Sequence, residues 1–133
     1  MIRLVYALAV GLSLAGEAAS EPDAANGAMV YRAFCAVCHG QDAKGDGVFA
    51  PALLIAPPDL TRIAANNGGV FPVFEVVARI DGRDPVLAHG GEMPLFGEAF
   101  VEQGAAIRAE TGQPIFTYQA IADVTQWLIE VQE

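Results

Sequence analysis

Two cysteines and a histidine stand together as Cys35-Ala36-Val37-Cys38-His39. Two thiols three positions apart on one helical turn can each form a thioether to one of the two vinyl groups on the same edge of a porphyrin. The imidazole of the next residue then turns under the iron. The C-x-x-C-H string is therefore typical of covalent attachment of a c-type haem. We expect Cys35 and Cys38 to be the tethers and His39 to be an axial ligand.

Two other chemistries use the same kinds of side chain. A redox C-x-x-C is expected beside a βαβ unit, and the helical periodicity of this chain shows no such unit. A zinc site needs four ligands, so His89 would have to join the motif, but adjacent Cys38 and His39 are poorly placed around one tetrahedral ion. Haem attachment is favoured, because the five-residue string is more specific than a bare C-x-x-C.

Residues 89–96 offer two candidates for the second axial position, Met93 and His89. Met93 precedes Pro94, which bars helix continuation, and the two glycines before it let the chain approach a flat ring closely. Met93 is the favoured ligand, while His89 is the alternative, because imidazole is an equally competent haem ligand. An open position is the third possibility. A His/Met pair fills both axial positions and favours electron transfer over bond-making chemistry.

These motifs resemble the small class I c-type cytochromes, in which a helix ends in C-x-x-C-H, a Met-Pro lies some tens of residues downstream, and a final helix crosses the first. The resemblance covers nearly everything after about residue 24. It implies an all-α fold with crossing terminal helices and short helices and loops around one covalently bound haem c. It also implies an electron carrier rather than an enzyme, a monomer that meets its donor and acceptor redox proteins transiently.

The resemblance also assigns packing roles to single residues. Gly27 and Tyr31 match the glycine and the aromatic residue of the first helix that contact the last helix. Trp127 stands near the position where the family carries an aromatic residue at this contact. The resemblance therefore predicts that these three residues meet where the terminal helices cross.

Further residues are candidates for contacts around the cofactor. The resemblance implies that the carbonyl of Pro51 accepts a hydrogen bond from the free imidazole nitrogen of His39, a role that a proline at 57–58 could take instead. Arg79 and Arg83 bracket the end of a predicted helix, and the two haem propionates need fork-shaped cationic partners. One of the two arginines could anchor a propionate, although solvated arginines on a helix surface are equally consistent with the pattern.

Apolar residues at helical spacing predict five helices, which span residues 23–38, 60–65, 72–81, 98–110 and 118–131. Asp59 and Thr117 are expected to cap the second and the last helix, and Gly82 is expected to end the third in a left-handed conformation. The second and third helices are expected to wall the haem. The third is expected to bury one stripe, made of Phe71, Phe74, Val77 and Ile80.

The stretch 97–113 is longer than the family pattern requires and reads as an insertion. It could pack beside the distal loop or contact a specific partner. This leaves a second function open, that of a dedicated cytochrome subunit of a periplasmic or membrane-associated dehydrogenase or oxidase. A third function, a five-coordinate haem that binds gases or reacts with peroxide, would require Met93 to be absent from the iron.

The first twenty residues read as a secretory signal, with Arg3, an apolar run over 4–15 and small residues at 18–20 before the cleavage site. A retained membrane anchor is the alternative, but its apolar run is short of the roughly 20 residues that span a bilayer. Cleavage leaves one domain, residues 21–133. Export fits the cofactor, because covalent haem attachment in bacteria takes place outside the cytoplasm, so we expect a periplasmic protein.

The formal net charge of the chain is −9. An acidic protein of this kind is a poor nucleic-acid binder. The charge favours docking onto basic or neutral redox partners, with an on-rate that depends on salt. Acidity could equally serve to keep an exported protein soluble. The chain holds no second C-x-x-C-H string, which predicts a single haem.

Overall fold

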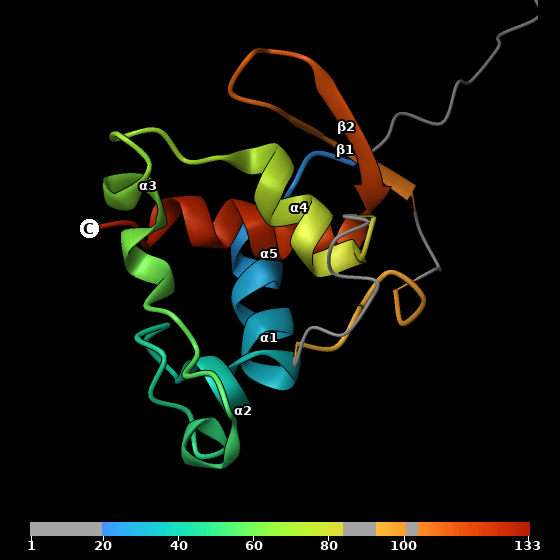
Figure 1. Ribbon diagram of the computed structural model, residues 1–133. Helices are drawn as coiled ribbons and strands as arrows, with labels where there is room; N and C mark the ends of the chain where they lie inside the picture. Colours follow the sequence, from blue (N-terminus) through green and yellow to red (C-terminus); the bar gives the residue numbers. More distant parts are fainter. Residues whose placement is uncertain (1–19, 84–92, 101–103) are drawn as a thin grey trace, which may run out of the picture.

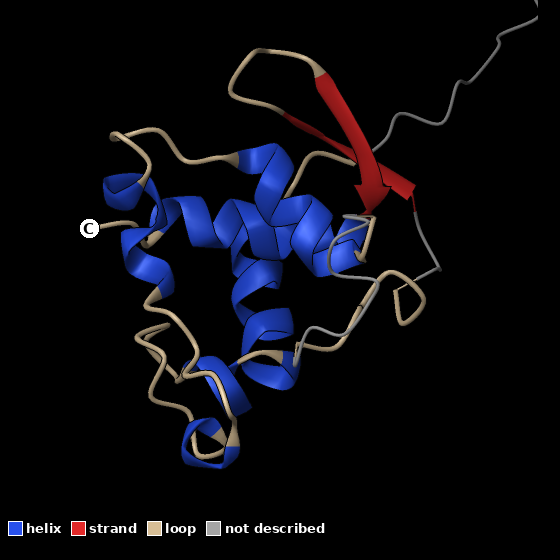
Figure 2. Ribbon diagram, viewed as in Figure 1, coloured by secondary structure: helices blue, strands red, loops and turns tan. Residues whose placement is uncertain are grey.

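The computed structural model describes residues 20–83, 93–100 and 104–133. Figure 1 shows α1 and α5 crossing near the centre, α4 lying across α5, and a hairpin of two strands on one side. Helices dominate the described chain (Figure 2), which confirms the helical architecture that the sequence predicts. In chain order the elements are α1 Ala24–Phe34, α2 Ala36–His39, the 3-10 turns η1 Ala50–Ala52 and η2 Leu60–Arg62, α3 Ile63–Asn66, α4 Val73–Asp81, β1 Gly104–Arg108, β2 Pro114–Tyr118 and α5 Gln119–Glu130.

The first predicted helix is divided in two at Cys35. Helix α1 begins after Asp23, whose carboxylate accepts hydrogen bonds from the backbone N–H groups of Ala25 and Asn26. Cys35 is the first residue beyond α1, and α2 follows it immediately as a single turn. The C-x-x-C-H residues thus occupy a short helix of their own.

Helices α1 and α5 approach each other most closely at Gly27. A Cβ atom at this position would overlap the carbonyl oxygen of Asp123 and would lie 3.0 Å from the Cβ of Trp127. One turn later the rings of Tyr31 and Trp127 meet with their centroids 4.3 Å apart. The predicted contact of Gly27, Tyr31 and Trp127 at the crossing is confirmed.

A buried carboxylate fixes the same crossing. The side chain of Asp123 on α5 accepts hydrogen bonds from the backbone N–H of Asp23 at 2.8 Å and from the Asn26 amide at 2.5 Å. Gln119 donates a third hydrogen bond to it at 2.7 Å. Because a buried carboxylate is tolerated only when it is hydrogen-bonded, this set of donors specifies how the start of α1 sits on α5.

Helix α4 follows the sequence prediction at both ends. It begins directly after Pro72 and ends at Gly82, which has a φ of 81°. Its buried side is slightly rotated from the predicted one: Phe74 is 49% exposed, and Val73 is buried instead. The prediction that Phe74 belongs to the buried stripe is therefore wrong. The predicted cap of the preceding helix is confirmed, because Asp59 accepts from Thr61 N at 2.9 Å.

The predicted helix over 98–110 is wrong, because β1 and β2 form an antiparallel hairpin in this region. Alternate residues of both strands are buried, with Ala106 opposite Phe116 on the outer face. The turn between them contains Gly112, with a φ of 86° that is costly for other residues. Thr117 lies in β2, and α5 begins without a side-chain cap, which corrects the predicted Thr117 cap.

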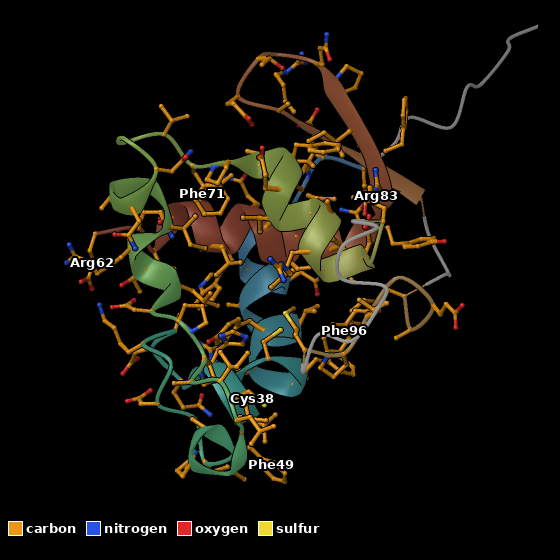
Figure 3. The ribbon with its side chains drawn as sticks, viewed as in Figure 1. Cys38, Phe49, Arg62, Phe71, Arg83 and Phe96 are labelled. Atoms are coloured by element: carbon orange, nitrogen blue, oxygen red, sulfur yellow. The ribbon has the colours of Figure 1, made fainter. Side chains whose placement is uncertain are left out.

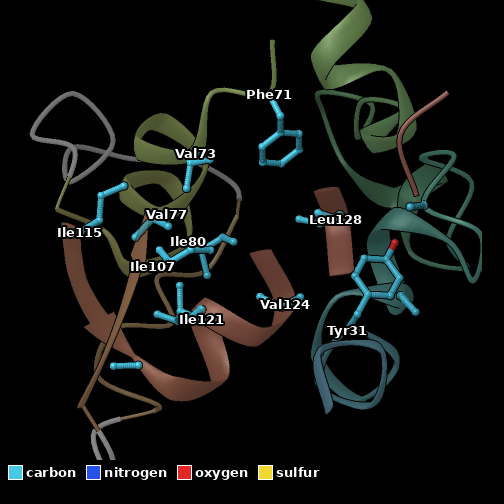
Figure 4. Packing of buried hydrophobic residues seen from close by; sticks show 14 residues of the cluster. Tyr31, Phe71, Val73, Val77, Ile80, Ile107, Ile115, Ile121, Val124 and Leu128 are labelled. Atoms are coloured by element: carbon cyan, nitrogen blue, oxygen red, sulfur yellow. The ribbon is translucent and has the colours of Figure 1, made fainter. Parts of the chain in front are cut away.

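The hydrophobic core is continuous from the hairpin to the first helix. Figure 4 shows Ile107 and Ile115 of the hairpin near Val77 of α4, with Val124 of α5 leading on toward Tyr31 of α1. The hairpin is therefore packed onto the helices rather than projecting from them. This packing makes it a fixed part of the domain.

The predicted signal lies in residues 1–19, outside the described residues, together with all but the last position of the predicted cleavage site. The cleavage site and the domain boundary at residue 21 therefore stay predictions. Among the described residues, no helix is long and apolar enough to cross a membrane.

Replacing Gly27 by alanine should destabilise the protein by about 1 to 3 kcal/mol, because the new methyl group overlaps the α5 backbone and forces the two helices apart. Chemical denaturation followed by circular dichroism would measure the change. Gly104→Ala is the matched control, since nothing lies within 4 Å of the added carbon, and it should stay within about 0.5 kcal/mol of the parent. Equal effects of the two substitutions would contradict the close approach at Gly27.

Candidate cofactor site

A cavity of about 580 Å³ lies beside the helix crossing and is lined from α1, α2, α4, α5 and the loop before η2. Its walls are mostly apolar and include Ile63, Ile80, Val124 and Leu128. Cavities of this size and character are typical of sites that enclose a cofactor. The helix crossing thus leaves room for a flat, largely apolar group.

The four residues that the sequence predicts as tethers and axial ligands all line this one cavity. Cys35, Cys38 and His39 reach it from the end of α1 and from α2, and Met93 reaches it from a distant part of the chain. His89, the alternative ligand, lies outside the described residues. The structure therefore brings two thiols, an imidazole and a thioether sulfur around a single apolar space.

Cys35 and Cys38 do not form a disulfide bond with each other. Burial, with a smaller contribution from the neighbouring Cys38, raises the pKa of the Cys35 thiol to about 11. Redox-active C-x-x-C pairs work in the opposite way, because they depend on a thiol with a lowered pKa. The environment of Cys35 thus disfavours the reactive thiolate on which disulfide exchange depends.

Helix α2 is held by backbone contacts from the loop that follows it. The N–H of Gly47 donates to the carbonyl of Cys38 at 3.1 Å, and the N–H of Phe49 donates to the carbonyl of Val37 at 2.9 Å. A Cβ on Gly47 would lie 2.5 Å from the carbonyl oxygen of Val37, so only glycine fits there. The loop therefore clamps the C-x-x-C-H turn through close backbone packing.

Tyr31 joins the helix crossing to the same turn. Its hydroxyl donates a buried hydrogen bond of 2.7 Å to the carbonyl of Gly40, the residue that ends α2. Burial raises the pKa of Tyr31 well above its ordinary range, so the phenol stays a neutral donor. One aromatic side chain thus fixes both the packing of α1 on α5 and the position of the C-x-x-C-H turn.

The ring of His39 is largely buried and lacks a protein partner at one nitrogen. Its Nδ1 atom makes no well-formed hydrogen bond to any described residue. Burial lowers the pKa of His39, and the backbone of Pro58 opposes this shift to a smaller extent. The side chain therefore favours the neutral form, which is the form that binds metals. A buried polar ring that faces a cavity without a complete set of partners fits a site built for a bound group.

The proline beside His39 is Pro58 rather than Pro51. Pro51 is exposed in η1 and does not line the cavity, whereas Pro57 and Pro58 do. Pro58, which the sequence left as an alternative to Pro51, is therefore the proline whose backbone lies near the His39 ring, although His39 Nδ1 makes no well-formed hydrogen bond to it. Between His39 and these two prolines the chain passes through η1, and Leu53 and Ile55 after it also line the cavity.

The two arginine candidates for a propionate contact differ in whether they line the cavity. Arg79 lines the cavity from α4, beside Glu75 one turn earlier. Arg83 does not line it, because its guanidinium is bonded to the Asp81 carboxylate and to the backbone carbonyl of Phe116. Of the two arginines, Arg79 is therefore the one that lines the cavity, and it stays the candidate for a propionate contact.

An aromatic cluster that the sequence analysis missed lies next to the attachment motif. The ring of Phe34, at the end of α1, lies edge-on to Phe100 at a centroid distance of 5.1 Å, and Phe96 and Phe100 are stacked at 5.8 Å. Phe96 and Phe100 follow Met93 in the chain, so the cluster fastens the distal segment to the helix that ends beside Cys35. No local pattern could have revealed this contact, because its members are about sixty residues apart.

Within the described part of the chain, no group of three or more histidine, cysteine or acidic side chains could hold a metal ion by itself. The zinc alternative thus has no ligand set among these residues. The apolar cavity, with Cys35, Cys38, His39 and Met93 in its lining, is instead consistent with a site for a covalently attached porphyrin.

A sequence model of the cytochrome c family matches residues 24–132. The chain belongs to the cytochrome c family, and its crossing terminal helices and cavity are consistent with the class I fold. Membership implies covalently bound haem c and a function in haem-based electron transfer. No curated protein and no solved structure gives a significant match to this chain.

Replacing Gly47 by alanine should lower the free energy of unfolding by about 1 to 3 kcal/mol and reduce the yield of covalently attached pigment, because the methyl group pushes the loop off α2. The pigment per protein can be measured on denatured protein by its absorbance. Val48→Ala is the control at the next position, since that side chain is 84% exposed, and it should leave both quantities unchanged. A harmless Gly47→Ala would show that the loop does not clamp the motif.

Proposed function

We propose that this protein is a periplasmic carrier that moves one electron at a time on a single haem c, with His39 and Met93 as the axial ligands. The observation that supports this proposal best is that Met93 lines the same apolar cavity as Cys35, Cys38 and His39, although it is far from them in sequence. Membership of the cytochrome c family supplies the coarser function of haem-based electron transfer between redox partners.

In this proposal the chain supplies attachment, ligation and a dry site. Cys35 and Cys38 hold the group through two thioether bonds, and the buried His39 ring offers a neutral nitrogen. The group, when bound, supplies a metal centre that changes its oxidation state by one electron. The surrounding apolar residues exclude water, which limits reorganisation around the changing charge.

Ligation on both sides distinguishes a carrier from the other candidate functions. A methionine sulfur and a histidine nitrogen together leave no vacancy for oxygen, peroxide or a small gas. Met93 is partly buried and packs against the hydrophobic core, and the segment after it is fastened by Phe96. These contacts favour a sixth position that stays filled, and they disfavour the gas-binding and peroxidatic alternatives.

The proposals for the cellular location and for the redox partners rest on the sequence. The apolar N-terminal segment and the covalent cofactor both favour export to the periplasm. The net charge of −9 favours transient docking onto basic or neutral redox proteins, which would slow at high salt.

Replacing Met93 by alanine should abolish the weak near-infrared absorption band that sulfur ligation gives to ferric haem, because the only sulfur proposed at the sixth position is removed. The reduced variant should also bind carbon monoxide promptly at neutral pH, whereas the parent should not. Met29→Ala is the control, since Met29 is 60% exposed on α1 and should not affect the spectrum. A parent spectrum without this band would contradict ligation by Met93.

Replacing Arg79 by glutamine should lower the reduction potential by roughly 20 to 40 mV, because a cation near the cofactor favours the reduced, less positive state and solvent screens part of its effect. Potentiometric titration measures this shift. Arg62→Gln removes an exposed arginine that does not line the cavity and should change the potential far less. Equal shifts in the two variants would contradict a specific role for Arg79.

A further inference from the structure

The segment that follows Met93 rests on the C-terminal end of α4. The backbone N–H of Phe96 donates to the carbonyl of Ile80 at 2.9 Å. Gly97 lies so close to Asp81 that a Cβ atom would overlap its carbonyl oxygen. Leu95 covers Gly82, where an added Cβ would lie 2.9 Å from the leucine side chain. The position of Met93 therefore depends on where this helix end is held.

The same helix end is tied to the hairpin by charged side chains. The carboxylate of Asp81 is only 5% exposed and accepts a hydrogen bond of 2.6 Å from Nε of Arg83 and one of 3.3 Å from the hydroxyl of Thr117. The guanidinium of Arg83 also donates to the backbone carbonyl of Phe116 at 2.6 Å. Figure 3 shows Arg83 at the junction of α4 and β2. Two contacts thus join β2 to the end of α4, one through the hydroxyl of Thr117 and one through the guanidinium of Arg83.

The hairpin itself is a firm point of attachment. Ile107 of β1 and Ile115 of β2 are 5% and 6% exposed, and both belong to the hydrophobic core. Charge-assisted hydrogen bonds to a buried carboxylate are stronger than neutral ones, and breaking them leaves the carboxylate without partners. Asp81 and Arg83 can therefore transmit the rigidity of the core to the helix end.

We propose that the β1–β2 hairpin braces the distal side of the cofactor site, and that Asp81 and Arg83 are positioning residues that hold the Met93 segment at the cavity. This inference rests on the proposed ligation by Met93. It gives the inserted stretch a role inside the molecule: it raises the fraction of protein in which the sixth position is filled by methionine. Loss of the brace lets the end of α4 move, and the Met93 segment moves with it.

The test is a competition between Met93 and imidazole added to the purified ferric holoprotein, followed by loss of the near-infrared band. In Arg83→Gln the apparent affinity for imidazole should rise about tenfold, since the charge-assisted contacts of Arg83 to Asp81 and to the Phe116 carbonyl are lost and internal ligation weakens accordingly. Thr117→Val removes the hydroxyl from the hairpin side and should shift the affinity in the same direction by a smaller factor. If Arg83 stabilised the end of α4 without the hairpin, Thr117→Val would leave the imidazole affinity unchanged.

Lys44→Gln is the matched control. Lys44 pairs with Glu133 at 2.6 Å, and its side chain is 35% exposed, compared with 39% for Arg83. Its loss removes an ion pair away from the Met93 segment whose cation is similarly exposed, although its carboxylate is more exposed, 63% for Glu133 and 5% for Asp81. The imidazole affinity should therefore not change. Unchanged affinity in either Arg83→Gln or Thr117→Val, or an equal rise in Lys44→Gln, would overturn the brace. Absence of the near-infrared band in the parent would instead overturn ligation by Met93, and the brace with it.

Discussion

The close backbone contact between α1 and α5 at Gly27 is the constraint on which the rest of the structure depends. It brings Tyr31 against Trp127, and the hydroxyl of Tyr31 then reaches the carbonyl that ends the attachment turn. The buried Asp123 carboxylate fixes the entry of α1 at the same contact. The angle at which the two helices cross therefore decides where two thiols and an imidazole stand relative to the apolar walls on α4 and α5.

The cavity is assembled from separate parts of the chain, each held by a different kind of contact. Backbone hydrogen bonds from the Gly47 loop hold the proximal turn, and aromatic stacking by Phe96 and Phe100 holds the distal segment to α1. Charged hydrogen bonds around Asp81 join the distal segment to the hairpin. A carrier benefits from this arrangement, because ligands that stay in place in both oxidation states keep the reorganisation during electron transfer small.

The sequence predicts those features whose signal is local. The C-x-x-C-H string, the Met-Pro and the glycine and aromatic positions of the terminal helices carry their chemistry in adjacent letters or at helical spacing, and the structure brings them together. The hairpin was missed because Ala105 and Ala106 have a high helix propensity, which pairing with β2 and burial of alternate residues override. The positions of Pro51 and Arg83 away from the cavity could not be predicted for a related reason: the path of a loop and a partner on a distant strand leave no trace in neighbouring residues.

The central claim is that one histidine and one methionine bind the same iron, and X-ray absorption at the iron edge tests it without any substitution. Spectra of the purified holoprotein should be recorded in the ferric and in the ferrous state, so that the atoms bound to iron are identified in both. The account predicts one sulfur among the iron ligands in each state, at nearly the same distance. A first shell of nitrogen or oxygen alone in either state would contradict it and would direct attention to His89 or to an open sixth position.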